Sequence, residues 1–225
     1  MASHKAIVTL AIFVSIAAIA VASWAFYNRP VDAPDWPASI SGFAFSPFQA
    51  NQDPAKDQYP TEQQLRDDLK LLSKHTNRVR TYSVKKSLGD VPLIAKEYGM
   101  QVTLGIWLSN IEEDNRKEIA RAIDIINANR NISLVVVGNE TVLRGEVDVP
   151  RLIEYIEEVR SQVKVPVTTA ETWDVWFKFP MLVQHVDVIA AHILPYWERI
   201  PSEQALDYVM HRASQLKETF PQKPL

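Results

Sequence analysis

The sequence predicts an α/β protein: a (β/α)8 barrel of the TIM type with about six of its eight β/α units present, preceded by an N-terminal transmembrane helix. Three features support this prediction. Strand-like and helix-like segments alternate along residues 40–225, polar and aromatic residues cluster where the strand-like segments end, and residues 6–27 carry no charged side chain. Strict alternation of strand and helix is typical of a parallel sheet with right-handed crossovers.

The composition excludes several other classes of protein. The 225 residues are 47% hydrophobic and 23% charged, which is close to the globular average and excludes a disordered, collagen-like or coiled-coil chain. A net charge of −3 argues against a nucleic-acid partner, since proteins that bind nucleic acids are usually basic. The absence of cysteine rules out disulfides, thiolate zinc sites and cysteine nucleophiles.

The first element is the apolar run at residues 6–27, which lies in a separate N-terminal region of residues 1–29. A bilayer core of ~30 Å requires about 20 helical residues, and Trp24 and Tyr27 stand at the far end of the run, where interfacial aromatic residues belong. We therefore expect an uncleaved signal-anchor in the inner or cell membrane. A cleaved signal peptide, which would leave a secreted protein, stays open because small residues occupy plausible cleavage positions at 20–22.

The charges that flank this run predict its orientation. Lys5 lies before it, whereas Arg29 is soon followed by Asp32 and Asp35. Because positive charge is retained on the cytoplasmic side, we expect the N-terminus in the cytoplasm and the rest of the chain in the periplasm or outside the cell. Three prolines make residues 30–39 a short stiff linker.

Residues 40–225 supply the six expected β/α units. Several strand-like segments are almost continuously apolar, which suits strands buried on both faces. The expected strands span residues 40–46, 77–82, 101–107, 133–138, 165–170 and 187–193. Helical patterns separate them. A capping box of Thr61 and Gln64 opens the first helix, isoleucines recur at helical spacing over 118–129, Pro150 marks a helix start, and 202–220 form a long amphipathic helix.

The positions of the polar residues distinguish a barrel from a doubly wound sheet. A Rossmann sheet carries a Gly-x-Gly-x-x-Gly turn after its first strand, and the chain has none. Instead, polar or aromatic residues follow strand after strand, as in a β/α barrel, whose catalytic groups gather at the carboxyl ends of the strands. These residues are Arg80, Tyr82, Trp107, Asn139, Glu140, Glu171, Trp173, His192, Tyr196 and Trp197.

Glu140 is the strongest catalytic candidate among them. It directly follows an apolar strand, where a partly desolvated carboxyl group suits general-acid catalysis, although its position alone also fits the first polar residue of a loop. Asn139 can hydrogen-bond a substrate hydroxyl, and Gly138 permits a close approach of backbone or sugar. Glu171 follows the next strand, and three roles stay open for it: a second carboxylate of the site, a ligand of sugar hydroxyls, or a helix N-terminal residue that does not handle substrate.

The aromatic residues at the strand ends indicate the type of ligand. Aromatic faces stack on the apolar faces of sugar rings, so the aromatic residues near the strand ends together predict a glycan groove, although any single tryptophan can instead belong to the core. They are Trp107, Trp173, Trp176, Tyr196 and Trp197. His185 and His192 lack the spacing of a helical metal pair. We therefore expect no metal site, and nothing in the sequence implies an organic cofactor.

Four segments together resemble glycoside hydrolase family 17, in particular its bacterial membrane-attached forms associated with β-1,3-glucan glucosyltransferases. They are RVRTYS, VVVGNE, VPVTTAETWDVW and DVIAAHILPYW, and they occur in the expected order on successive predicted strands. The resemblance covers about residues 40–225. It implies a retaining (β/α)8 barrel that hydrolyses β-1,3-glucan or transfers part of it to another glucan.

The resemblance also implies roles for individual residues. Glu140, after Asn139 on strand four, corresponds to the acid/base, and Arg80 and Tyr82 are expected near the sugar. The remaining matches are His192 and Tyr196 on strand six, and Glu171 with Trp173 in the strand-five signature of the bacterial group.

The nucleophile of that family is a glutamate at the end of the seventh strand, a position that the sequence up to Leu225 does not reach. We therefore expect this chain to be a fragment, cut before strand seven, with little or no turnover of its own. Two other hypotheses stay open. One is a non-catalytic module that binds glucan, and the other is a scaffold or remnant that does neither.

Overall fold

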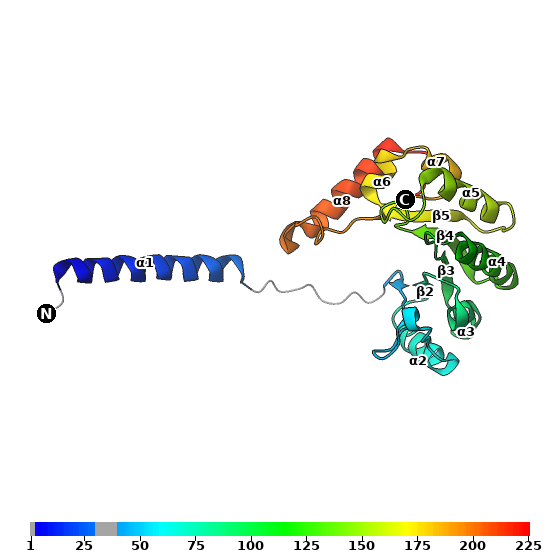
Figure 1. The fold of residues 1–225 in the computed structure, drawn as a ribbon, viewed down its shortest axis with the longest axis horizontal. Helices are drawn as coiled ribbons and strands as arrows, with labels where there is room; N and C mark the ends of the chain where they lie inside the picture. The colour runs from blue at the N-terminus through cyan, green and yellow to red at the C-terminus, as the bar shows by residue number, and fades with distance from the viewer. Residues whose placement is uncertain (1–2, 30–39) are drawn as a thin grey trace. The chain divides into compact units, whose positions relative to one another are not determined.

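The structure, a computed structural model, describes residues 3–29 and 40–225 and falls into two units (Figure 1). The N-terminal unit is a single helix, α1 (His4–Tyr27), capped by the Ser3 side chain, which accepts a hydrogen bond from the Ala6 amide. At 1.5 Å per residue the helix is about 36 Å long. The helix is long and apolar enough to cross a membrane, and a signal sequence can have the same length and composition. The linker expected at 30–39 lies outside the described residues.

The second unit is built on one parallel sheet of six strands, which are neighbours in chain order. The strands are β1 (Phe43–Ala44), β2 (Arg78–Arg80), β3 (Gln101–Ile106), β4 (Ile132–Asn139), β5 (Val167–Thr172) and β6 (Ala190–His192). Each overlaps an expected strand. The sheet curls into a half-barrel with the helices on its outside (Figure 1). An unbroken strand order is that of a β/α barrel, whereas a doubly wound sheet reverses its order, so the partial-barrel prediction is confirmed.

The helices that cover the sheet are α2 (Glu62–Leu72), α3 (Val91–Glu97), α4 (Glu112–Ala128), α5 (Val149–Arg160), α6 (Trp173–Lys178), α7 (Leu182–His185) and α8 (Ser202–Thr219), with 3-10 turns η1 (Pro54–Lys56) and η2 (Lys86–Asp90). The capping box is confirmed: the Gln64 amide donates to Thr61 Oγ1 at 3.3 Å and the Thr61 amide to Gln64 Oε1 at 2.8 Å. α4 begins at Glu112 rather than at residue 118, because its first turn is acidic and has no apolar repeat.

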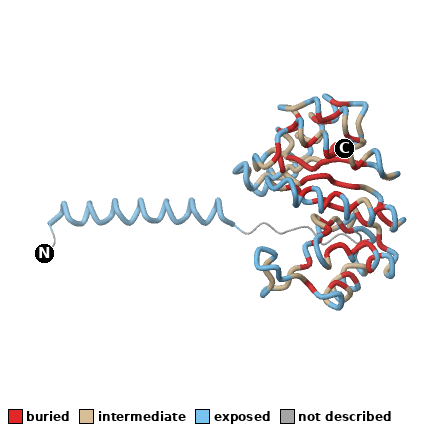
Figure 2. The backbone as a smooth tube through the Cα atoms, turned by 45° about the vertical axis from the view of Figure 1, so that its right-hand side comes forward, coloured by how far each residue is buried: buried red, intermediate tan, exposed pale blue. Residues whose placement is uncertain are grey.

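The core lies between the sheet and the inner faces of the helices, as the buried segments of Figure 2 show. Leu65 and Leu69 of α2 and Ile119 of α4 have no exposed surface and pack in the same cluster as the strand residues. Trp176 is also fully buried, and its Nε1 donates to the Ala190 carbonyl at 3.3 Å. This tryptophan is therefore a core residue rather than a sugar platform.

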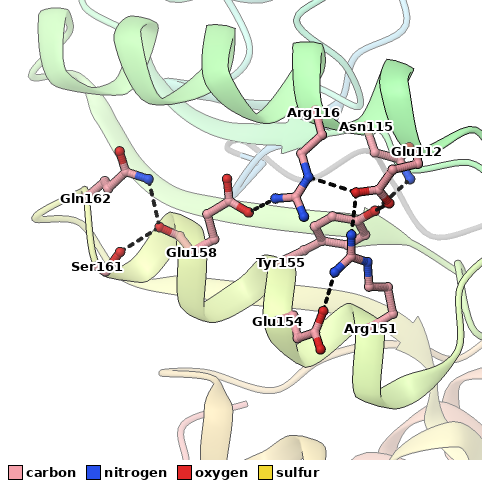
Figure 3. A network of polar contacts seen from close by, with 9 residues as sticks. All are labelled: Glu112, Asn115, Arg116, Arg151, Glu154, Tyr155, Glu158, Ser161 and Gln162. Atoms are coloured by element: carbon pink, nitrogen blue, oxygen red, sulfur yellow. Dashed lines mark hydrogen bonds and ion pairs between the residues drawn. The ribbon is translucent and has the colours of Figure 1, made fainter.

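A polar network joins α4 to α5 on the outside of the sheet (Figure 3). The Glu112 carboxylate accepts hydrogen bonds from the Tyr155 hydroxyl, from Arg116 at 2.8 Å and from Arg151. The guanidinium groups of Arg116 and Arg151 lie 5.2 and 4.7 Å from the centre of the Tyr155 ring. The tyrosine hydrogen bond and the two arginines lower the pKa of Glu112 to about 2. The network stabilises the packing of these two helices.

Candidate active site

The turn after β4 has an unusual backbone. Gly138 has φ +82 and Glu140, although not a glycine, has φ +51. The pairing with β5 shifts register between Val136 and Asn139, after which the Glu140 amide donates to the Ala170 carbonyl at 2.7 Å. A non-glycine residue in the left-handed region costs about 1–3 kcal/mol, and such strain is concentrated at functional sites. The backbone conformation at Glu140, the candidate acid/base, therefore lowers the stability of the fold.

The side chain of Glu140 belongs to a chain of hydrogen bonds that connects three strand ends. Its Oε1 lies 2.5 Å from Nδ1 of His192, and Nε2 of that histidine lies 2.9 Å from Arg80. Arg80 also donates to Asn139 Oδ1 at 2.7 Å. A guanidinium group can only donate, so Nε2 of His192 accepts and its proton resides on Nδ1, from which it is donated to Glu140. The structure therefore brings four expected site residues together.

Arg80 supplies the fixed positive charge of this group. Burial lowers the pKa of its guanidinium, while Tyr82 and Glu140 oppose that shift, and an arginine stays charged in proteins. The guanidinium carbon lies 4.9 Å from the centre of the Tyr82 ring. Arg80 and Tyr82 thus contact each other as expected, and Arg80 also contacts His192, the hydrogen-bond partner of Glu140.

A cavity of about 470 Å³ opens beside Glu140, over the ends of the last three strands. It is lined by Glu140, Leu143, Thr172, Trp173, Asp174, His192, Leu194, Trp197 and Glu198. Nε1 of Trp173 donates to Glu198 at 2.8 Å, and Arg212 lies 3.9 Å from the centre of a Trp173 ring. One face of this tryptophan is therefore covered by the arginine, which limits it as a stacking surface.

A second hollow, of about 640 Å³, lies over the ends of the first three strands. Its lining includes the aromatic side chains of Phe48, Tyr59, Tyr82 and Trp107. Trp107 follows β3 and is 40% exposed, and the guanidinium of Arg144 packs 4.4 Å from its ring centre. The two hollows together place acids, a histidine and aromatic faces along the carboxyl edge of the sheet.

Two of the candidate site residues, Glu171 and Tyr196, line neither of the two hollows. Glu171 is fully buried, and its carboxylate accepts hydrogen bonds from the amides of Val142 and Leu143 at 2.9 and 3.3 Å. Its oxygens thus accept hydrogen bonds from the backbone, and it lines neither hollow. Tyr196 is 82% exposed, lines neither hollow, and packs edge-on against Trp197 with ring centres 5.4 Å apart.

Comparison with known proteins identifies the family. Residues 42–225 match the family model of the BtgE/BtgC glycoside hydrolase domain. The chain is a member of this family. Among the described residues of this BtgE/BtgC domain, no cluster of histidine, aspartate and glutamate side chains suits a metal ion.

Individual relatives of the BtgE/BtgC domain include the Aspergillus fumigatus protein named "Probable glucan endo-1,3-beta-glucosidase btgC", which is 30% identical over 162 residues. That match covers 65% of this chain and 23% of the relative, so the chain spans about a quarter of the relative's length. The glycoside hydrolase family 17 β-1,3-glucanosyltransferase of Rhizomucor miehei is 25% identical with a TM-score of 0.71, over 82% of this chain and 68% of that one. A mutant of the same enzyme has been solved with laminaritriose.

The sequence analysis missed two residues that contact the candidate site of this BtgE/BtgC domain. Arg144 donates to the carbonyls of Asn139 and Leu108 while it packs on Trp107. Glu118 of α4 is buried and accepts from the Ser83 hydroxyl at 2.6 Å and the Val84 amide at 2.7 Å. Glu118 stands on the apolar face of the predicted helix, beside Ile119, and a carboxylate at such a position is the signal that could have revealed it.

Proposed function

We propose that this chain binds β-1,3-glucan along the carboxyl edge of its sheet and that Glu140 is the acid/base residue of a retaining hydrolase or glucanosyltransferase. The observation that carries the proposal is the hydrogen-bonded series from Glu140 through His192 and Arg80 to Asn139, which lies beside the cavity. Family membership and the β-1,3-glucan activities of the relatives support the choice of substrate.

In the proposed reaction, protonated Glu140 donates its proton to the glycosidic oxygen as the bond from that oxygen to the anomeric carbon breaks. The resulting carboxylate then removes a proton from the water or sugar hydroxyl that attacks in the second step. His192 holds Oε1, and Oε2 makes no hydrogen bond with any residue that the structure describes. Oε2 is therefore the oxygen proposed to carry the transferred proton.

A retaining mechanism needs a second carboxylate, ~5–5.5 Å from the first, to attack the anomeric carbon. Glu171 is unsuited to that role because it is buried and bonded to backbone amides. Asp174 and Glu198 do line the cavity, and Glu198 is bonded to Trp173 and Tyr208. On the likeness to family 17 we propose that the nucleophile belongs to a seventh strand outside these 225 residues and that this chain alone has little or no turnover.

The test is to incubate the chain with laminarin, assay the release of reducing ends, and measure laminaritriose binding by calorimetry. The proposal expects binding with little or no product. Turnover that is abolished by Glu140→Gln and by either Asp174→Asn or Glu198→Gln would place the nucleophile within the chain and contradict the second part of the proposal. No binding would contradict the first part.

A non-catalytic glucan-binding module is the second candidate, favoured by the aromatic hollow around Tyr82 and Trp107, which can hold sugar rings without any chemistry. The two candidates differ when a family 17 nucleophile segment is joined in frame after Leu225. If the chain is part of an enzyme, the extended protein gains turnover that depends on Glu140. If the chain is a binding module, the extended protein gains none.

We also propose that α1 anchors the chain through residues 6–27, with the N-terminus in the cytoplasm and the remainder periplasmic or extracellular. The helix length, its apolar sequence and the Lys5 charge before it support this arrangement. N-terminal sequencing of protein from membrane and secreted fractions separates the anchor from a cleaved signal peptide, which would give a new terminus near residue 22.

A further inference from the structure

Glu171 is a fully buried carboxylate for which the proposed reaction has no use. It stands on β5, and the amides of two consecutive residues point to it, Val142 to Oε1 at 2.9 Å and Leu143 to Oε2 at 3.3 Å. Burial raises the pKa of Glu171, and the amide hydrogen bonds and the nearby Arg144 oppose that rise. Burial of a carboxylate costs free energy, so its presence at this position indicates a structural or functional role.

The two amides belong to the turn that carries Glu140. Residues 140–146 are closed by three backbone hydrogen bonds: the Arg144 amide to the Glu140 carbonyl at 2.8 Å, Gly145 to Val142 at 3.1 Å and Glu146 to Thr141 at 3.1 Å. These three hydrogen bonds connect Glu140 to Val142 and to the rest of the turn. Its attachment to Glu171 therefore fixes Glu140, whose φ of +51 needs external support.

The same turn also reaches the aromatic hollow. Arg144 donates to the Leu108 carbonyl at 2.9 Å and packs 4.4 Å from the centre of the Trp107 ring. The attachment at Glu171 is thus connected to Glu140 on one side and to Trp107 on the other.

We infer that Glu171 is a positioning residue: it anchors the turn 140–146 from below, so that Glu140 meets His192 and Arg144 supports Trp107. The inference deepens the proposed function and rests on it for its catalytic meaning. Glu171→Gln removes one of the two acceptor oxygens and sets an NH2 group against an amide N–H, which detaches one side of the turn.

Glu118 offers a matched control for the loss of a buried carboxylate. It too is buried and accepts hydrogen bonds from backbone amides, those of Val84 at 2.7 Å and Trp107 at 3.4 Å. It therefore supports Trp107 but bonds to no residue of the turn 140–146. Glu118→Gln makes the same chemical change without touching the Glu140 turn.

The experiment records nitrogen NMR spectra of the full chain in detergent micelles, with labelled histidine, because the ring nitrogens report which of them carries the proton. Wild-type His192 is expected to be protonated at Nδ1. In Glu171→Gln the His192 Nδ1 signal is expected to shift, because a fraction of the molecules then carries the proton on Nε2 instead. The affinity for laminaritriose is expected to fall about tenfold. In Glu118→Gln the amide oxygen can keep the three hydrogen bonds that Oε1 accepts, so the His192 signal is expected to stay as in wild type.

A folded Glu171→Gln variant with a wild-type His192 signal would overturn the inference, and so would a wild-type His192 protonated at Nε2. If the variant does not fold, hydrogen exchange in the wild-type chain decides: slow exchange of the Val142 and Leu143 amides supports the anchor, and free exchange overturns it. The His192 signal needs no sugar. A chain that shows the expected signals but binds no laminaritriose would therefore refute the proposed function and leave the positioning role standing.

Discussion

Replacement of Gly138 by alanine is expected to destabilise the fold by about 2–5 kcal/mol. The backbone at Gly138 has φ +82, and an L-residue in the left-handed region costs roughly 1–2 kcal/mol. A Cβ atom there would also lie 2.6 Å from Thr141 Oγ1 and 3.4 Å from the terminal carbons of Leu108 and Leu152. Thr141 is fully buried, so relief of the collision requires overpacking that costs about 1–3 kcal/mol.

The assay is urea unfolding, supported by melting temperatures, which fall by about 2–4 °C per kcal/mol in a domain of this size. Gly99→Ala is the matched control, because Gly99 has φ +68 but nothing within 4 Å of a new Cβ, and it should lose only the backbone contribution. The double variant Gly138→Ala with Thr141→Ala should recover the collision part relative to Thr141→Ala alone. Equal losses for the Gly138 and Gly99 variants, or no recovery in the double variant, would refute this reasoning.

Three further predictions concern other parts of the chain. Trp176→Ala should cost about 3–5 kcal/mol in urea unfolding, since the side chain is fully buried in the core; a loss below about 1 kcal/mol would be incompatible with that burial. Trp107→Ala should weaken laminaritriose binding about tenfold in calorimetry with little change in melting temperature. Unchanged affinity would contradict a contact between Trp107 and the sugar. Glu112→Gln should lower stability at neutral pH. Because the folded pKa of Glu112 is depressed to about 2 from an ordinary 4.5, its stabilisation is present above about pH 4.5 and lost as the pH falls toward 2. Urea midpoints of the two proteins should therefore converge over that range, and a constant difference would contradict the assignment.

Much of the fold was predictable because its signals are local. All six strand segments were located from their apolar runs, and α2 and α5 from a capping box and an N-terminal proline. The short helices α3, α6 and α7 gave no prediction, since stretches of four to seven residues are too short to show a helical period. Their place in the fold is set by packing against the sheet.

The candidate site was predictable in part. Arg80, Asn139, Glu140 and His192 follow three strands, and a parallel sheet brings such ends to one edge. Sequence position alone did not tell which way the side chains of successive strand-end residues face. The sequence therefore left the role of Glu171 open, and only the structure shows that it accepts hydrogen bonds from amides that follow another strand, a contact 29 positions distant in sequence for Val142 that no local pattern records.

The central claim is that Glu140 acts on a β-1,3-linked sugar held along the carboxyl edge of the sheet. The most direct measurement is a crystal structure of the full chain with laminaritriose. The account predicts a carboxyl oxygen of Glu140 within about 2.6–3.2 Å of an interglycosidic oxygen, with a sugar ring against Trp107. A bound trisaccharide that leaves Glu140 without contact, or that occupies another surface, would contradict it.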